Sequence, residues 1–238
     1  MTAGTVSQHI SKQFDNELED IRERVLFMGG LVEQQLINAM KALMETKIEL
    51  AEGVIENELR VNSLEVSIDE DCTQILARRQ PAARDLRLVM AVIKTITDLE
   101  RVGDEAEKIA KMAVELIEKH GPKSYYVSIN GMGNFVSKMV HDALDAFARM
   151  DSLAALEVAG REPETDDMYV AILRQLITYM MEDPRKITAT IDAVWAIRAL
   201  ERIADHARNI CEYVIYFVEG KDVRHISIEE MKKEVSED

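Results

Sequence analysis

The sequence predicts an all-α protein whose six helices form two pseudo-symmetric three-helix bundles of the up-down type. Three observations favour this fold class. Only ten glycines and four prolines interrupt a chain of 238 residues that is rich in good helix formers. Apolar residues recur three or four positions apart along most of the sequence. The two halves of the chain also repeat one another, as a duplicated helical unit would.

Three helices are predicted in the first half, over residues 8–46, 48–78 and 82–119. Gln80-Pro81 separates the second helix from the third, because proline fits the first turn of a helix but not its interior. The pair Gly29-Gly30 lies inside the first helix. Each interior glycine costs about 0.5 to 1 kcal/mol relative to alanine, so a kink is expected there.

The second half is predicted to contain helices over residues 133–151, 153–181 and 184–219. The stretch 119–133 is the richest in glycine, proline and serine and is expected to link the two halves. Asp183-Pro184 starts the last of these helices, with Asp183 as a plausible N-cap. It matches the break at Gln80-Pro81 in the first half.

The two halves correspond at constant displacements along the chain. Met28-Gly29 matches Met132-Gly133, which lies 104 residues further on, and Leu99–Asp104 matches Leu200–Asp205, which lies 101 residues further on. The second copy is therefore three residues shorter between its second and third helices. We divide the chain into a first repeat at 1–120, a second repeat at 121–220 and a flexible acidic tail at 221–238.

The third helix of each copy carries an apolar stripe that is expected to form the core. In the first copy the stripe comprises Val89, Val92, Ile96, Leu99, Gly103, Ala106, Ala110, Ala113 and Ile117, and in the second copy Leu200, Ala204, Ala207, Cys211, Val214 and Val218. Trp195, the only tryptophan, is expected to be a packing anchor beside this stripe. Cys72 and Cys211 show no CxxC spacing and are interpreted as small buried hydrophobic residues.

The composition excludes several functional classes. A net charge of −15 without a basic stripe argues against binding to nucleic acid. The N-terminal sequence lacks the pattern of a signal peptide, and no apolar run approaches the roughly 18 to 20 residues of a membrane span. We expect a cytoplasmic protein that meets the membrane only through partners.

Acidic pairs border the apolar stripe at equivalent places in the two copies. Glu100 and Asp104 lie four residues apart, as do Glu201 and Asp205, so each pair lies on one face of its helix. Like charges at this spacing destabilise a helix by a few tenths of a kcal/mol unless a cation or a basic residue compensates. Other acidic pairs with the same spacing occur in this chain, so only the recurrence in both copies distinguishes these two.

The second helix of each copy supplies further oxygen-bearing side chains. Glu58 and Asn62 correspond to Glu162 and Asp166 at the displacement of 104 residues. Neighbouring antiparallel helices would then bring together two groups, which we call the first and second acidic sets. The first acidic set comprises Glu58, Asn62, Glu100 and Asp104, and the second acidic set comprises Glu162, Asp166, Glu201 and Asp205. Such oxygen ligands suit magnesium, calcium, manganese or iron.

Two other interpretations compete with a metal site. Arg101 and Arg202, or nearby lysines, could neutralise the carboxylates in surface salt bridges worth about 0 to 1 kcal/mol each. A catalytic di-iron centre would require Glu-x-x-His, which none of the five histidines provides, and no phosphate-binding loop or HExxH motif occurs. His206, next to Asp205, could border a metal, but it is interpreted as an ordinary polar helix position.

Four segments resemble the PhoU family in content, order and spacing, over about residues 8 to 220. They are Met28–Glu33, Arg79–Arg87, Asp98–Ala106 and Leu200–Ala207. The resemblance implies the six-helix fold and metal clusters of iron or zinc, with magnesium or manganese as alternatives, on the acidic sets. Asn62 departs from a strictly acidic motif, so weaker metal binding is expected at the first set.

The resemblance also implies a function without catalysis. Members of the family repress phosphate uptake and the phosphate-starvation (Pho) response when phosphate is plentiful. They link the phosphate ABC transporter, through its ATPase subunit, to a sensor histidine kinase, and a homodimer is expected. The alternative interpretation is a carboxylate-metal enzyme or a metal-storage helical protein, based on the same acidic sets.

Overall fold

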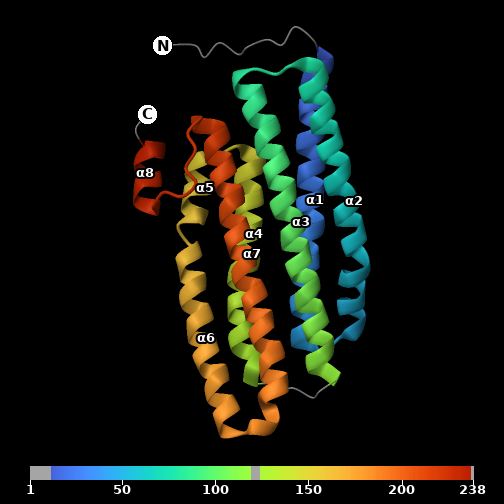
Figure 1. The fold of residues 1–238 in the computed structure, drawn as a ribbon, viewed down its shortest axis with the longest axis vertical. Helices are drawn as coiled ribbons and strands as arrows, with labels where there is room; N and C mark the ends of the chain where they lie inside the picture. The colour runs from blue at the N-terminus through green and yellow to red at the C-terminus, as the bar shows by residue number, and fades with distance from the viewer. Residues whose placement is uncertain (1–11, 119–123, 237–238) are drawn as a thin grey trace.

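The computed structural model describes residues 12–118 and 124–236, and within them it contains helices and no strands. The first half consists of α1 (Lys12–Glu45), α2 (Ile48–Arg79) and α3 (Ala83–Glu118) (Figure 1). The second half consists of α4 (Ser124–Arg149), α5 (Ser152–Ala159), α6 (Glu162–Glu182), the 3-10 turn η1 (Pro184–Lys186) and α7 (Ile187–Glu219). The all-α class is confirmed. Residues 8–11 of the first predicted helix lie outside the described residues.

The described part of the chain forms eight α-helices, and the two additional helices have clear physical reasons. The predicted helix 153–181 is divided into α5 and α6 at Gly160-Arg161. Pro163 lies in the first turn of α6, because its ring would clash with the carbonyl of Ala159 if the helix continued. The predicted linker at 119–133 is too long, since Gly131 and Gly133 both lie inside α4.

The second additional helix corrects the prediction of a flexible tail at 221–238. Helix α8 (Ile228–Ser236) packs against α5, and Met231 and Val235 are buried. Ser227 and Glu230 cap its start reciprocally: the Glu230 carboxylate accepts from the Ser227 N–H, and the Ser227 hydroxyl accepts from the Glu230 N–H. This Ser-x-x-Glu capping box is visible in the sequence and signals the helix.

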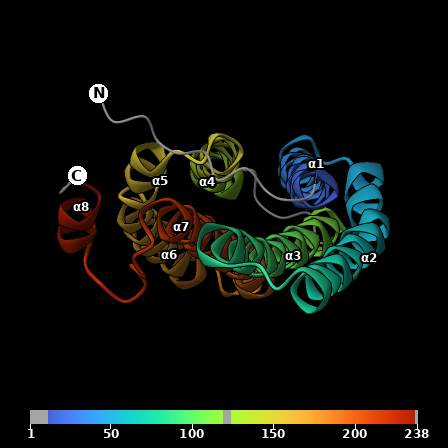
Figure 2. The same ribbon diagram turned by 90° about the horizontal axis from the view of Figure 1, so that it is seen from above.

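The two halves pack into one body. Helix α3 contacts α7 and α1 contacts α4, while α2 and α6 lie on the outer sides (Figure 2). The buried apolar residues of both halves belong to a single hydrophobic core. The repeats at 1–120 and 121–220 are thus halves of one core. No helix within the described residues is long and apolar enough to cross a membrane.

Helices α1 and α4 pack through two equivalent glycines. A Cβ atom on Gly29 would lie 2.5 Å from the Leu144 side chain, and a Cβ atom on Gly133 would lie 2.2 Å from that of Met40. Each glycine therefore receives one large side chain of the opposite helix. Gly133 is the counterpart of Gly29, and Leu144 of Met40, at the displacement of 104 residues, so the contact follows the pseudo-symmetry of the fold.

The predicted apolar stripes form the core, with differences at three side chains. Ile117 is only partly buried and Val218 is 36% exposed, because both lie near the ends of their helices. Cys72 and Cys211 are fully buried, as predicted. The prediction for Trp195 is wrong: its side chain is 61% exposed.

Candidate functional site

Glu58 is the centre of the first acidic set. It lies on α2, is only 5% exposed and faces Gly103 of α3, where a Cβ atom would lie 2.9 Å from its Oε2. Glycine at this position therefore leaves room for the carboxylate. The side chain of Gln35 on α1 donates to Oε2 over 3.0 Å, whereas Oε1 is buried without a hydrogen-bond partner. One oxygen of the carboxylate is thus left unsatisfied.

The surroundings of Glu58 disfavour its negative charge. The pKa of its carboxyl is raised from 4.5 to about 7, mainly by burial; the hydrogen bond from Gln35 opposes this rise, and the charges of Asp104, Glu107 and Glu100 contribute to it. Burial also raises the pKa of Glu100, with the Asp104 charge as the next cause. Residues of α2 and α3 therefore act on one another electrostatically and favour a proton or a cation.

Asn62, one turn after Glu58 on α2, adds a neutral oxygen to this set. Its Oδ1 is buried and has no hydrogen-bond partner. An unsatisfied buried oxygen costs about 1 to 3 kcal/mol, so the unpaired oxygens of Asn62 and Glu58 are expected to bind a cation or water.

In the second acidic set, Glu162 and Asp166 come from α6, and Glu201 and Asp205 come from α7. Burial is the main reason that the pKa values of Glu162, Glu201 and Asp205 are raised. The charge of Asp166 raises all three further. The predicted approach of the two helices therefore brings these four side chains into one electrostatic group.

Arginines distinguish the second acidic set from the first. Arg208 donates to Oε2 of Glu162 over 2.9 Å, and Arg198 donates to Oε1 of Glu201 over 2.5 Å. The other oxygen of Glu201, Oε2, is buried without a hydrogen-bond partner. In the first half the positions of Arg198 and Arg208 are occupied by Thr97 and Glu107. Among the described residues, arginines thus donate hydrogen bonds to the second set and not to the first.

Arg101 and Arg202, the compensating residues expected from the sequence, are not the ones that pair with the acidic sets. Arg202 instead contacts Glu105 on α3, with 2.8 Å between Nε and Oε1. The Arg101 charge lowers the pKa of Glu100, but this effect is smaller than that of burial. Salt bridges therefore offset part of the negative charge of the second acidic set, but the arginines that form them are Arg198 and Arg208.

The acidic sets fit a cation in chemistry but do not form a complete ligand cage. Within residues 12–118 and 124–236, no three or more His, Cys, Asp and Glu side chains are arranged to hold a metal ion. The unpaired buried oxygens of Glu58, Asn62 and Glu201 are nevertheless hard donors of the kind that magnesium, manganese and iron accept. A metal would have to draw the remaining carboxylates together by changes of side-chain rotamer.

A buried polar network that the sequence analysis missed joins the two halves beside the acidic sets. Asp98 on α3 accepts hydrogen bonds from Asn209 (3.0 Å) and from the Tyr213 hydroxyl (2.8 Å), and its Oδ1 lies 2.6 Å from Nδ1 of His206. His206 is therefore a buried partner of Asp98 and not an ordinary polar position. The signal was Asp98 itself, a carboxylate that directly precedes Leu99 of the apolar stripe and whose counterpart in the second half is Ala199.

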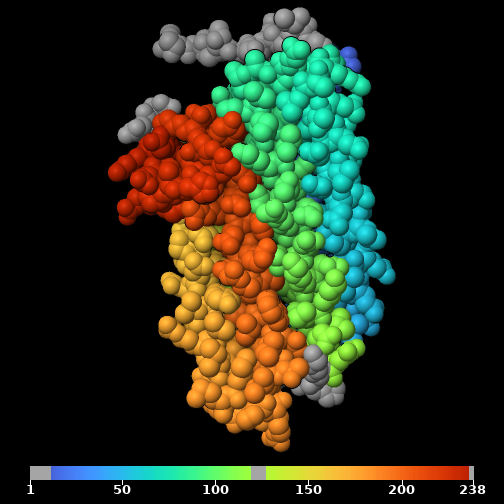
Figure 3. Space-filling view, viewed as in Figure 1, coloured from blue at the N-terminus to red at the C-terminus, as the bar shows by residue number. Residues whose placement is uncertain are grey.

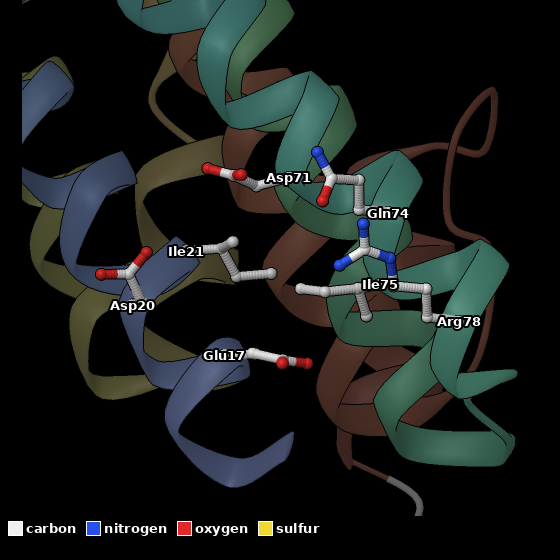
Figure 4. Close-up of a pocket in the computed structure, with 7 residues that line it drawn as sticks. All are labelled: Glu17, Asp20, Ile21, Asp71, Gln74, Ile75 and Arg78. Atoms are coloured by element: carbon white, nitrogen blue, oxygen red, sulfur yellow. The ribbon is translucent and has the colours of Figure 1, made fainter. Parts of the chain in front are cut away.

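A separate acidic cleft of about 130 Å³ lies between α1 and α2 (Figure 4). Glu17 and Asp20 line it from α1, and Asp71 lines it from α2. Two of these carboxylates are already neutralised, because Arg79 donates two hydrogen bonds to Glu17 and Arg24 pairs with Asp71. None of the three carboxylates has a buried oxygen without a hydrogen-bond partner, which is the feature that marks the acidic sets.

Comparisons with known proteins give a consistent result. The family model described as "PhoU domain" matches twice, at residues 25–113 and 129–214. The chain is 52% identical to the phosphate-specific transport system accessory protein PhoU homolog of Pseudomonas aeruginosa, over 97% of this chain and 96% of that protein. It is 47% identical to the accessory protein PhoU of Escherichia coli K12, over 98% of this chain and 96% of that protein.

Two crystal structures share the fold. PhoU from Pseudomonas aeruginosa superposes with a TM-score of 0.86 at 51% identity, covering 88% of this chain and all of that one. The phosphate transport system regulatory protein PhoU from Streptococcus pneumoniae superposes with a TM-score of 0.82 at 31% identity, covering 89% of this chain and 99% of that one. The likeness therefore extends over both halves.

Proposed function

Because the chain belongs to the PhoU family, we propose that it is an accessory protein of the phosphate transport system that represses phosphate uptake and the Pho response. It acts as an adaptor between the phosphate ABC transporter, through the ATPase subunit, and the sensor histidine kinase. The observation that carries this proposal is the similarity along both repeats to proteins described as accessory or regulatory. Binding, without catalysis, is sufficient for this role.

The architecture supports an adaptor function. The two halves share one core, so the molecule presents its surfaces in a fixed relation to each other. Different faces can then bind different partners at the same time. We place the protein in the cytoplasm, where the ATPase subunit and the kinase domain are accessible, and we propose that it functions as a homodimer.

We further propose that the two acidic sets bind cations. The support is the group of mutually repelling carboxylates in each half and the unpaired buried oxygens of Glu58, Asn62 and Glu201. A bound divalent cation would supply positive charge that offsets this repulsion and would hold two helices together. The arginines beside the second set and the neutral Asn62 in the first set are expected to give the two sites different affinities.

A reporter experiment tests the regulatory proposal. The gene is deleted, and a phosphate-starvation reporter is measured in medium with abundant phosphate. We expect derepression, and restoration of repression by the wild-type gene. A reporter that stays repressed after deletion would refute the proposal. Complementation with the double variant Glu201→Ala and Asp205→Ala, together with measurement of bound metal in the purified protein, tests whether the second acidic set contributes to signalling.

A further inference from the structure

An apolar groove lies on the surface between α6 and α7. It has a volume of about 420 Å³ and is lined by Tyr169, Leu173, Met180, Ile191, Val194, Trp195 and Arg198, which we call the α6–α7 groove. Trp195 is 61% exposed and Ile191 is 44% exposed. The hairpin of α6 and α7 projects beyond the ends of α3 and α4 (Figure 1), and both of its helices reach the surface side by side (Figure 3). Large apolar side chains grouped at a surface mark an interaction site.

The first half shows that the fold does not require the aromatic side chains of this groove. The counterparts of Tyr169 and Leu173 on α2 are Glu65 and Asp69, and the counterpart of Trp195 on α3 is Lys94. Lys94 packs over Tyr213 and Tyr216 of α7, with its Nζ 5.4 Å from each ring centre. Three of the lining positions are therefore charged in the first copy, whereas Met180, Ile191 and Val194 correspond to the apolar Leu76, Met90 and Ile93. The aromatic rings and the arginine of the groove belong to the second copy alone.

Arg198 gives the groove a cationic end. Its guanidinium lies over the Tyr169 ring, 6.0 Å from the centre, and donates to Glu201 at the edge of the second acidic set. The side chain is 47% exposed, so other N–H groups of the guanidinium remain accessible to a ligand. In a chain of net charge −15, an exposed arginine beside an apolar groove favours an occupant that carries a carboxylate.

The charge also argues against a second copy as the occupant. A two-fold pairing of two such grooves would bring together two Arg198 side chains of like charge, with no carboxylate supplied by the facing groove lining. A helix from another protein can instead offer an apolar anchor and, one turn away, a carboxylate. Helical residues three or four positions apart lie on one face, which matches a groove with an apolar centre and a cationic end.

We propose that the α6–α7 groove binds an amphipathic helix of a partner protein, which inserts a bulky apolar side chain beside Trp195 and pairs a carboxylate with Arg198. The proposal rests on the adaptor function proposed above, because it assigns one of the adaptor's contacts to this surface. Tryptophan and arginine are the residue types that most often dominate the energy of an interface.

Binding measurements with purified full-length protein test the assignment. The probes are the purified ATPase subunit of the phosphate transporter and the purified cytoplasmic part of the sensor kinase, both from the same organism. We expect at least one of them to bind, with affinity reduced about tenfold or more by Trp195→Ala and by Arg198→Glu. Arg198→Lys, which keeps the charge, should lose less affinity. The control Leu59→Ala removes an apolar side chain that is 74% exposed on α2 and should leave binding unchanged.

The possible outcomes separate the groove from the wider function. If the wild-type chain binds neither probe, the inference and the proposed adaptor function both fail. If it binds one of them and the Trp195 and Arg198 variants bind equally well, only the groove assignment fails. Sedimentation equilibrium measures the oligomeric state of the wild type and of Trp195→Ala. A wild-type dimer that dissociates in the variant would assign the groove to a second copy and overturn the proposal. Circular dichroism confirms that each variant is folded.

Discussion

Replacing Glu58 with glutamine should stabilise the metal-free protein at alkaline pH. The carboxyl is buried and its pKa is raised from 4.5 to about 7, first by burial and then by Asp104, Glu107 and Glu100 on α3. Between these two pH values the folded state binds a proton that the unfolded state has released. Glu58 therefore contributes stability that is present below pH 4.5 and is lost as the pH rises through 7.

The size of the effect follows from the change in pKa. A rise from 4.5 to about 7 corresponds to about 3 kcal/mol of free energy of unfolding. Glutamine keeps the shape of the side chain and remains uncharged at every pH. Glu58→Gln should thus be within about 1 kcal/mol of the wild-type stability at pH 5 and should exceed it by about 3 kcal/mol at pH 8.

Urea unfolding of chelator-treated protein at pH 5 and pH 8 measures this difference. Glu56→Gln, at an exposed position of the same helix, is the matched control. Its free energy of unfolding relative to wild type should be the same at both pH values. A Glu58→Gln variant that is less stable than wild type at pH 8 would refute the reasoning. Such a result would mean that other groups already compensate the charge of the ionised Glu58 carboxylate. Added divalent metal should stabilise the wild type and not the variant if the first acidic set binds it.

Three further predictions concern packing and buried groups. Gly29→Ala should destabilise the fold by about 1 to 3 kcal/mol, because the new methyl group meets a leucine of α4. Gly30→Ala has open space around the new methyl group and should stabilise the fold by about 0.5 to 1 kcal/mol. Equal effects of the two variants in thermal unfolding would contradict the packing of α1 on α4. Asp98→Ala should cost about 3 kcal/mol or more, since it removes the shared partner of the buried His206 and of the partly buried Asn209 and Tyr213. A loss below about 1 kcal/mol in urea unfolding would show that the network is dispensable. Burial raises the pKa of both thiols, that of Cys72 to about 12. Neither Cys72 nor Cys211 should therefore react with a disulfide reagent at pH 8 until denaturant is added. A thiol that reacts in the native protein would contradict their burial.

The main helices and the repeat could be predicted because their signals are local. Periodicity of three to four residues identifies the buried face of a helix, and it predicted the burial of Val92, Leu99 and Ala204. Proline also acts locally, through its ring and its missing N–H. The sequence therefore contains the signals for the start of α6, at Pro163, and for the start of α8, at Ser227 and Glu230, although neither helix boundary was predicted.

The candidate site divides in the same way. Spacing of four residues and the displacement between the copies are properties of the sequence, so the membership of the two acidic sets could be stated in advance. The pairing of Arg198 with Glu201 depends on the helix surface and is also local. The unpaired state of the Glu58 oxygen is not local, because it depends on Gly103 and Gln35 from two other helices.

By itself, the sequence determined which residues form helices, which face of each helix is apolar and which motifs recur. Only the tertiary structure decided which apolar faces are covered. Trp195 lies between the buried Ala193 and Ala196 but lines the surface groove between α6 and α7. His206 meets Asp98 only because α3 packs against α7. Burial depends on the position and length of the neighbouring helices, and a pattern within one helix contains no information about either.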